Sequence, residues 1–139
     1  MKTLLFVLLL MGASLPGVES LEGLRNDARQ HEKNIAVYFS GSDWCTNCHR
    51  FRRNVLEQDT IKSLLDNGYV YYVADFPQRK KLDKETVSLN EALAEKLNPD
   101  GVFPVLVLTD SDWNIKARIY NGNALETIMH KLKSNATAQ

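Results

Sequence analysis

Two cysteines, Cys45 and Cys48, are the residues of this chain best suited to covalent chemistry, and they are its only cysteines. Only two residues separate them, so a disulfide between them would close a very small loop and add little stability in the loop-entropy model. Such a pair suits reversible thiol–disulfide exchange better than it suits a structural cross-link. We therefore take Cys45 and Cys48 as the candidate catalytic residues and as a redox-active disulfide.

The elements around the pair are those that would place a cysteine at the start of a helix. Residues 35–39 form an apolar run rich in β-forming residues, which predicts a buried strand. A turn is expected at 40–43, followed by Trp44, the cysteines and an amphipathic helix. Free backbone N–H groups at a helix start favour a thiolate on the first cysteine. Cys45 is therefore the expected nucleophile and Cys48 the expected resolving cysteine.

The rest of the chain alternates helices and strands. Helical spacing predicts a first short helix from Leu21, and a capping box at Ser88 and Glu91 predicts another helix after a polar loop at 77–87. Apolar spacing also predicts helices after residue 59 and from residue 125. Further strands are expected at 69–74, 105–109 and 115–120, the last two forming a hairpin. This order predicts an α/β fold with a central mixed β-sheet flanked by helices on both faces.

The first residues have the pattern of an export signal. Lys2 precedes an apolar run at 4–11, and small residues allow cleavage after Ser20. The run is much shorter than the ~20 apolar residues of a membrane-spanning helix, which disfavours an anchor. We expect residues 1–20 to be a signal peptide and residues 21–139 to be one domain, periplasmic or extracellular, with no stable membrane insertion after cleavage.

The charge balance excludes one class of partner. Lys and Arg together number 17, and so do Asp and Glu. A balanced net charge gives no electrostatic reason to expect nucleic acid or an anionic membrane as partner, so we expect no nucleic-acid partner.

Two short motifs resemble those of the thioredoxin superfamily. The segment Trp44-Cys45-Thr46-Asn47-Cys48 resembles its WCxxC signature, and Phe103-Pro104 before the strand at 105–109 resembles its cis-proline site. The resemblance covers roughly residues 33 to 133. It implies a thioredoxin-like fold, a cis Pro104, and substrate binding by Trp44, Phe103 and Pro104.

Within the superfamily, the chain most resembles exported thioredoxin-like proteins and the C-terminal domain of DsbD-type periplasmic reductases. The shared features are the lead-in at 41–44, the segment at 54–59 and the strand at 71–75. This resemblance implies a monomer without a cofactor that exchanges disulfides with protein or peptide thiols. It also implies a redox partner protein as electron donor or acceptor, and favours a reductase over an oxidase.

The chain departs from the superfamily at the proton acceptor. Many thioredoxins carry a buried aspartate on the strand before the motif, and that place falls on Tyr38 here. A tyrosine with a pKa of ~10 is a poor base at neutral pH. Asp75 and Asp43 are the remaining candidates for a proton acceptor, although a surface turn is the simpler interpretation of Asp43.

A c-type haem site is the main alternative. Cys45 to His49 also match CxxCH, with His49 as proximal ligand and Met129 or His130 as distal candidates. A preceding β-strand and the alternation of strands and helices disfavour this interpretation, because small c-type cytochromes are mostly helical.

Two further interpretations concern metal and partner binding. Two cysteines and His49 give three ligands at most, so no metal site is expected. A thioredoxin-fold binding or chaperone module stays open, because a fold alone does not specify a function. The basic cluster Arg50, Arg52 and Arg53 is interpreted as a solvated helix face rather than a docking site.

Overall fold

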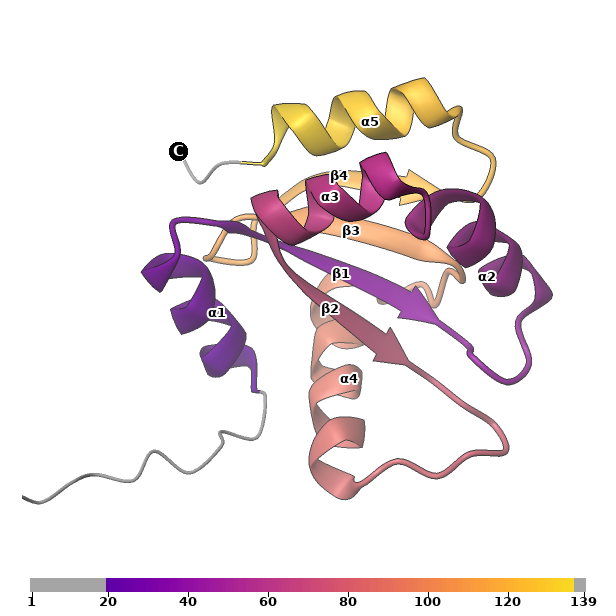
Figure 1. Ribbon diagram of the computed structural model, residues 1–139. Coiled ribbons are helices and arrows are strands. Elements are labelled where there is room, and N and C mark those ends of the chain that lie inside the picture. Colours follow the sequence, from indigo (N-terminus) through magenta and orange to yellow (C-terminus); the bar gives the residue numbers. More distant parts are fainter. Residues whose placement is uncertain (1–19, 137–139) are drawn as a thin grey trace, which may run out of the picture.

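The computed structural model describes residues 20–136 of the chain (Figure 1). The predicted signal peptide therefore lies outside the described residues, apart from its last residue. That residue, Ser20, caps the first helix, α1 (Leu21–Gln30), and its Oγ accepts the backbone N–H of Gly23 at 2.9 Å. The described fold thus begins where the predicted signal peptide ends.

The described helices and strands follow the predicted order. After α1 come β1 (Asn34–Ser40), α2 (Thr46–Phe51), the π-helical segment η1 (Arg52–Leu56), α3 (Asp59–Gly68), β2 (Tyr69–Asp75), α4 (Lys84–Leu97), β3 (Val105–Thr109), β4 (Ile115–Tyr120) and α5 (Leu125–Ser134). The two strands predicted to form a hairpin match β3 and β4 over their whole length.

The four strands form one mixed sheet in the order β2-β1-β3-β4. Strand β1 pairs in parallel with β2 and antiparallel with β3, and β3 continues into the antiparallel hairpin with β4. All seven residues of β1 are buried, as its apolar sequence requires. This inner strand fixes the position of the turn that follows its carboxyl end.

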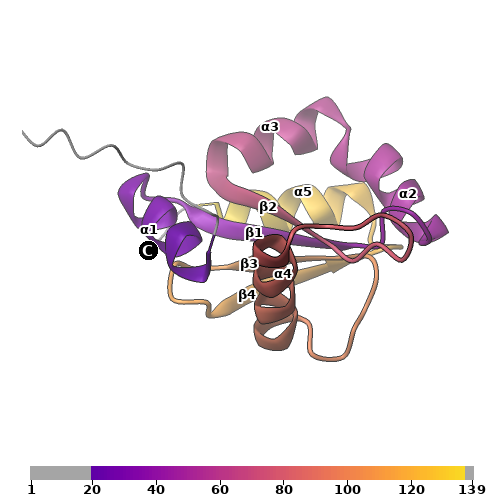
Figure 2. The ribbon, with the colours of Figure 1, turned by 90° about the horizontal axis from the view of Figure 1, so that it is seen from below.

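Helices cover both faces of the sheet, and this confirms the predicted α/β architecture (Figures 1 and 2). Side chains of β1 alternate between the two layers. Ile35, Val37 and Phe39 pack in the core with α1 and α4. Ala36 and Tyr38 pack in the opposite core, with α3 and α5.

The helix after the cysteines differs from the predicted one. It changes from α to π geometry at Arg52, so that Phe51 and Leu56 are both buried while Val55 is only half-buried. A spacing of five residues brings two side chains to the same side of a π-helix. Val55, four residues after Phe51, is half-buried and packs against the same core, so the sequence places Phe51, Val55 and Leu56 on one apolar face correctly and misses only the π geometry.

Helix α4 begins earlier than predicted. Asp83 is its N-cap and accepts the backbone N–H of Thr86 at 2.8 Å. The predicted capping box at Ser88 and Glu91 is wrong, because both residues lie inside the helix. The polar loop after β2 is correspondingly shorter and ends before Lys84.

Candidate active site

A tight turn at the carboxyl end of β1 carries the candidate site. The backbone N–H groups of Trp44 and Cys45 both donate to the carbonyl of Gly41, at 3.3 and 2.9 Å. A Cβ at Gly41 would overlap the Trp44 indole, so only glycine lets the indole lie across the turn. The turn thereby delivers Cys45 to the first position before α2.

The two cysteines are joined by a disulfide at the start of α2, with their Cα atoms 5.2 Å apart. Cys45 is the N-cap of the helix, and its Sγ accepts the backbone N–H of Cys48 at 3.2 Å. Both side chains are buried, with 6% of Cys45 and 2% of Cys48 exposed. A donor aimed at Sγ would stabilise negative charge on Cys45 once the disulfide is reduced.

An aromatic surface surrounds the pair. Trp44 is 40% exposed, and its Nε1–H donates to the carbonyl of Phe76 at 2.7 Å. Its ring meets Phe103 edge-on at a centroid distance of 5.7 Å, and Phe103 meets Phe76 at 5.5 Å. These contacts bring the segment before β3 against the redox turn, although Trp44 and Phe103 are 59 residues apart in the sequence.

The peptide bond between Phe103 and Pro104 is cis, as the resemblance implied. Pro104 is buried at the start of β3, while Phe103 is half-buried and Val102 is exposed. The side chain of Asn98 closes the preceding loop by bonding both the N–H and the carbonyl of Val102, at 2.9 and 3.0 Å. The structure thus brings Trp44, Phe103 and Pro104 to the same end of the sheet.

Tyr38 occupies the place where a thioredoxin would have its buried aspartate, and it acts as a donor. Its hydroxyl donates to the backbone carbonyl of Cys48 at 3.1 Å, and its ring stacks on Phe51. Burial raises the pKa of the Tyr38 hydroxyl above its usual value, so the hydroxyl stays protonated at neutral pH and serves as a donor. Tyr38 therefore positions the turn of helix that carries Cys48, a role that residue spacing did not reveal.

Asp43 faces away from the cysteines and holds a separate loop. Its carboxylate accepts the backbone N–H groups of Gln78, Arg79 and Lys80, each at 2.8 Å. The N–H of Gln78, together with those of Lys80 and Arg79, lowers the pKa of Asp43 to about 2. A carboxylate this stabilised is a poor proton acceptor.

Asp75 is linked to the cysteine site through Ser42. Ser42 donates to the Asp75 carboxylate from its backbone N–H at 2.9 Å and from its hydroxyl at 2.5 Å. Ser42 also lines, together with Cys48 and Ser40, a small pocket of about 40 Å³. That volume is enough for at least one water molecule.

The remaining polar residues near the pair form no metal site. His49 is half-buried and lines the same small pocket as Arg52, which pairs with Glu57 at 3.6 Å. Within residues 20–136, no group of three or more His, Cys, Asp or Glu side chains could hold a metal ion.

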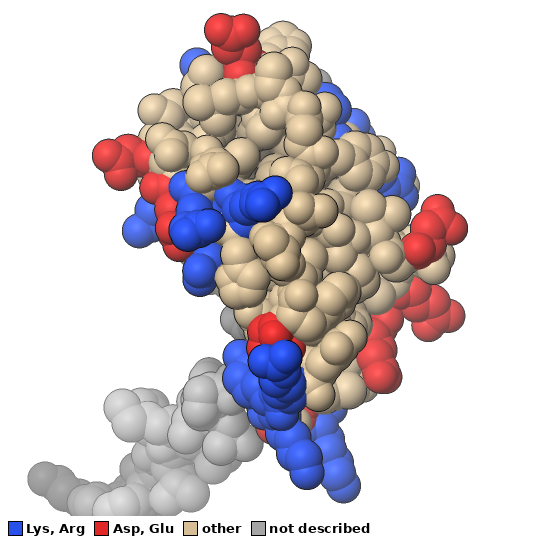
Figure 3. Space-filling model, turned by 90° about the vertical axis from the view of Figure 1, so that its right-hand side faces the viewer, with Lys and Arg blue, Asp and Glu red and all other residues tan. Residues whose placement is uncertain are grey.

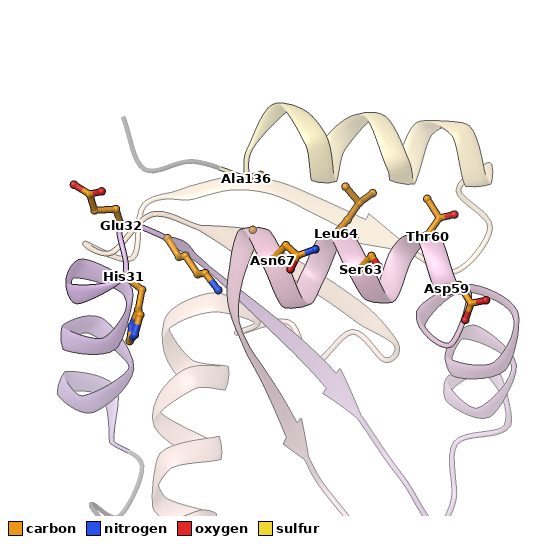
Figure 4. Close-up of a pocket in the computed structure, with 10 residues that line it drawn as sticks. His31, Glu32, Asp59, Thr60, Ser63, Leu64, Asn67 and Ala136 are labelled. Atoms are coloured by element: carbon orange, nitrogen blue, oxygen red, sulfur yellow. The ribbon is translucent and has the colours of Figure 1, made fainter.

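A larger hollow of about 680 Å³ lies elsewhere (Figure 4). It runs along α3 from Asp59 to Asn67, and His31 and Glu32 border it from the turn after α1. No residue of α2 or of the redox turn lines it, so it takes no part in the cysteine chemistry.

This geometry matches a known family. The sequence model of the thioredoxin-like domain family matches residues 23–133. These residues include the redox turn, the cis-proline loop and the whole sheet. The chain belongs to the thioredoxin-like domain family. Membership also disfavours haem attachment, because the cysteines stand at the strand–turn–helix junction where that family carries its redox motif.

One curated relative is the disulfide bond reductase DsbH of Chlamydia pneumoniae. It is 29% identical over 101 residues, which cover 73% of this chain and 60% of the relative. The chain therefore matches less than two thirds of that protein's length.

Solved structures support the same fold. A DsbH oxidoreductase superposes with a TM-score of 0.72 at 25% identity, over 83% of each chain. The solution structure of a thioredoxin from Thermus thermophilus gives 0.60 at 16% identity, over 83% of this chain and 82% of that one. The oxidised C-terminal domain of DsbD from Neisseria meningitidis gives 0.56 at 15% identity, over 82% and 90%.

Proposed function

We propose that the protein is a thiol–disulfide oxidoreductase that acts mainly as a reductase. The observation that carries this proposal is the Cys45–Cys48 disulfide at the start of α2, with the N–H of Cys48 donating to Sγ of Cys45. The name of the Chlamydia pneumoniae relative, a disulfide bond reductase, supports the direction.

The first step uses the reduced form of the pair. The Cys45 thiolate attacks one sulfur of a partner disulfide, forms a mixed disulfide with it, and releases the other sulfur as a thiolate. The N–H of Cys48, 3.2 Å from Sγ in the oxidised form, favours the charged nucleophile. Trp44, Phe103 and Pro104 would bind the partner's extended segment beside the disulfide.

The second step resolves the mixed disulfide. Cys48 loses its proton and attacks Sγ of Cys45, which forms the Cys45–Cys48 disulfide and releases the partner's second thiolate. Two electrons have then passed from the protein to the partner. A redox partner protein with a dithiol must return two electrons before the next cycle.

We assign the proton of Cys48 to Asp75 rather than to Asp43. Water in the 40 Å³ pocket would link the Cys48 thiol to the hydroxyl of Ser42, which donates to the Asp75 carboxylate. Asp43, with its pKa lowered to about 2 by the N–H of Gln78 and its neighbours, is held by the loop instead.

We also propose that the protein acts outside the cytoplasm as a monomer. The apolar run at 4–11 with small residues before Leu21 supports export to the periplasm or the extracellular space. None of the helices within residues 20–136 is long and apolar enough to cross a membrane.

The test of this function compares the wild type with Cys45→Ser in dithiothreitol-driven reduction of insulin. We expect the wild type to accelerate precipitation of the insulin B chain, and Cys45→Ser to have no activity above dithiothreitol alone. Thr46→Ser is the matched control, because it changes an exposed neighbour of Cys45 without removing a sulfur. Full activity of Cys45→Ser would leave a binding module as the better explanation.

The direction is tested by equilibrating the pair with glutathione. A reductase should have a potential near the thioredoxin value of about −270 mV, whereas an oxidase would lie near about −120 mV. A value near the second would reverse the proposed direction.

A further inference from the structure

A loop of basic residues is fixed against the redox turn. Residues 78–81, which we call the basic loop, include Arg79, Lys80 and Lys81, and all three side chains are exposed. The loop's backbone faces Asp43, which accepts three of its N–H groups at 2.8 Å. Because Asp43 directly precedes Trp44, the basic loop and the redox turn hold a constant position relative to each other.

A second basic group lies on the other side of the cysteines. Arg50 near the end of α2 and Arg53 in η1 are exposed. The side chain of neither makes a hydrogen bond or ion pair within the described residues. The side chain of Lys81 in the basic loop is equally uncommitted. Arg52, by contrast, pairs with Glu57 at 3.6 Å.

The acidic side chains near the pair are already engaged. Asp43 is held by three N–H groups, and Asp75 by Ser42 and by Lys80 at 3.4 Å. Asp100, in the loop before the cis-proline, is exposed. The chain as a whole carries no net charge, so the excess of positive charge beside the cysteines is local.

Figure 3 faces this end of the molecule. Basic side chains gather most densely at the lower end of an uncharged central surface, and basic and acidic side chains both stand around its other borders. Exposed apolar side chains of this end include Trp44 at 40% and Val102 at 39%. Exposed apolar side chains beside a dense group of cations suit a partner that is apolar at its disulfide and acidic beside it.

We propose that the basic loop, with Arg50 and Arg53, selects polypeptide substrates whose target disulfide is flanked by acidic residues. This inference rests on the proposed function and names its substrate class. Asp and Glu beside the partner's cystine would meet Arg79, Lys81 and the two arginines, while Trp44 and Phe103 cover the cystine itself. Charges of this kind raise the association rate and lose their effect as salt screens them.

The experiment measures the second-order rate constant for oxidation of the reduced protein by three cystine peptides. The peptides are identical except for flanking Glu, Gln or Lys residues. We expect the Glu peptide to react about tenfold faster than the Lys peptide at an ionic strength of about 0.02 M, and less than about threefold faster at about 0.5 M.

The charge-reversal variant is Arg79→Glu with Lys81→Glu, for which the Glu-to-Lys rate ratio should fall to about one or below. The matched control is Lys96→Glu with Lys133→Glu, which changes the net charge equally at exposed positions on α4 and α5. The control should keep the wild-type ratio. Melting curves of both variants show that each is folded.

Three results would contradict the inference. A wild-type ratio near one, or an unchanged ratio in the Arg79 and Lys81 variant, would remove the docking role alone. An equal fall of the ratio in the control would attribute the preference to net charge instead of to the basic loop. Failure of the wild type to react with any peptide would remove the proposed function and the docking surface together.

Discussion

Two turns at opposite ends of the sheet are each organised by one aspartate. The redox turn follows β1 and contains Asp43, and the hairpin turn joins β3 to β4 and contains Asp110. The two lie at opposite ends because β1 and β3 run antiparallel, with Ile35 beside Thr109. Each carboxylate accepts three N–H donors, yet the donors come from different parts of the chain.

The difference lies in the distance along the sequence. Asp110 accepts the backbone N–H of Asp112 and both the backbone and side-chain N–H of Asn114, each at 2.9 Å. Asp43 accepts N–H groups 35 to 37 residues further along. A local set closes its own hairpin, whereas a distant set joins two segments. The carboxylate of Asp43 thus couples the redox turn to the basic loop, whereas that of Asp110 closes its own hairpin turn. The link from this turn to α1 is made by Asp112 with Arg25 and Arg29.

Among changes to carboxylates, the largest effect on redox rate should come from Asp75→Asn. Loss of the carboxylate should slow resolution of the mixed disulfide by about 100-fold at pH 7, the lower end of the usual contribution of a positioned base. The slowing should diminish above the ordinary thiol pKa of ~8.5, where Cys48 loses its proton without help. Stopped-flow kinetics over that pH range checks both expectations.

Asp110→Asn is the control for that experiment, because it makes the same chemical change in the hairpin turn. It should leave the resolution rate at the wild-type value. A pH-independent slowing in Asp75→Asn would show that Asp75 only holds Ser42 in place.

A smaller effect is expected from Asp43→Ala. Removal of the carboxylate should speed amide hydrogen exchange of Gln78, Arg79 and Lys80 by about tenfold or more, because their acceptor is lost. Exchange rates of these three amides, measured by NMR, test the coupling directly. Unchanged protection would mean that the loop is held by something other than Asp43.

The wild type gives a pH test of the same anchor. The pKa of Asp43 is lowered to about 2 by the N–H of Gln78 and its neighbours, so its contribution is present above the ordinary carboxyl range. The contribution is lost as the pH falls through about 2. Relative to intrinsic exchange rates, protection of the loop amides should therefore persist at pH 4.

Asp110→Ala should have no effect on redox rate and should act on stability alone. Loss of its hydrogen bonds should lower the free energy of unfolding by about 1–2 kcal/mol, as urea titration would measure. Burial opposes ionisation, but the hydrogen bonds from Asn114 and Asp112 outweigh it and hold the pKa of Asp110 below its usual value. The difference from wild type should therefore shrink as the pH falls through the acid range. A slower redox reaction in this variant would contradict the comparison.

The same contrast explains how much could be predicted from the sequence. The buried strand at 35–39, the helix start at Cys45 and the hairpin at 105–120 depend on residues close in sequence, and all three were predictable. The role of Asp43 was not, because its partners are backbone groups of a distant loop that leave no trace in residue type.

Other differences have equally physical causes. The hydroxyl of Tyr38 reaches the carbonyl of Cys48 only because α2 folds back over β1. Helix α4 begins at Lys84 because Asp83 and Thr86 form a cap one turn before the Ser88 box, and an earlier cap lets the helix extend. Packing of Phe51 and Leu56 in one core favours the π-turn over the α-helical spacing that the sequence suggested.

The most direct test of the central claim is covalent capture of a disulfide partner by Cys48→Ser. This variant keeps the proposed nucleophile but cannot resolve the mixed disulfide, so a cystine peptide should remain attached through Cys45, as mass spectrometry of the digested adduct would show. Cys45→Ser, which keeps only Cys48, should capture none at neutral pH. Attachment through Cys48 in Cys45→Ser, with none through Cys45 in Cys48→Ser, would contradict the assignment of the two cysteines and the mechanism built on it.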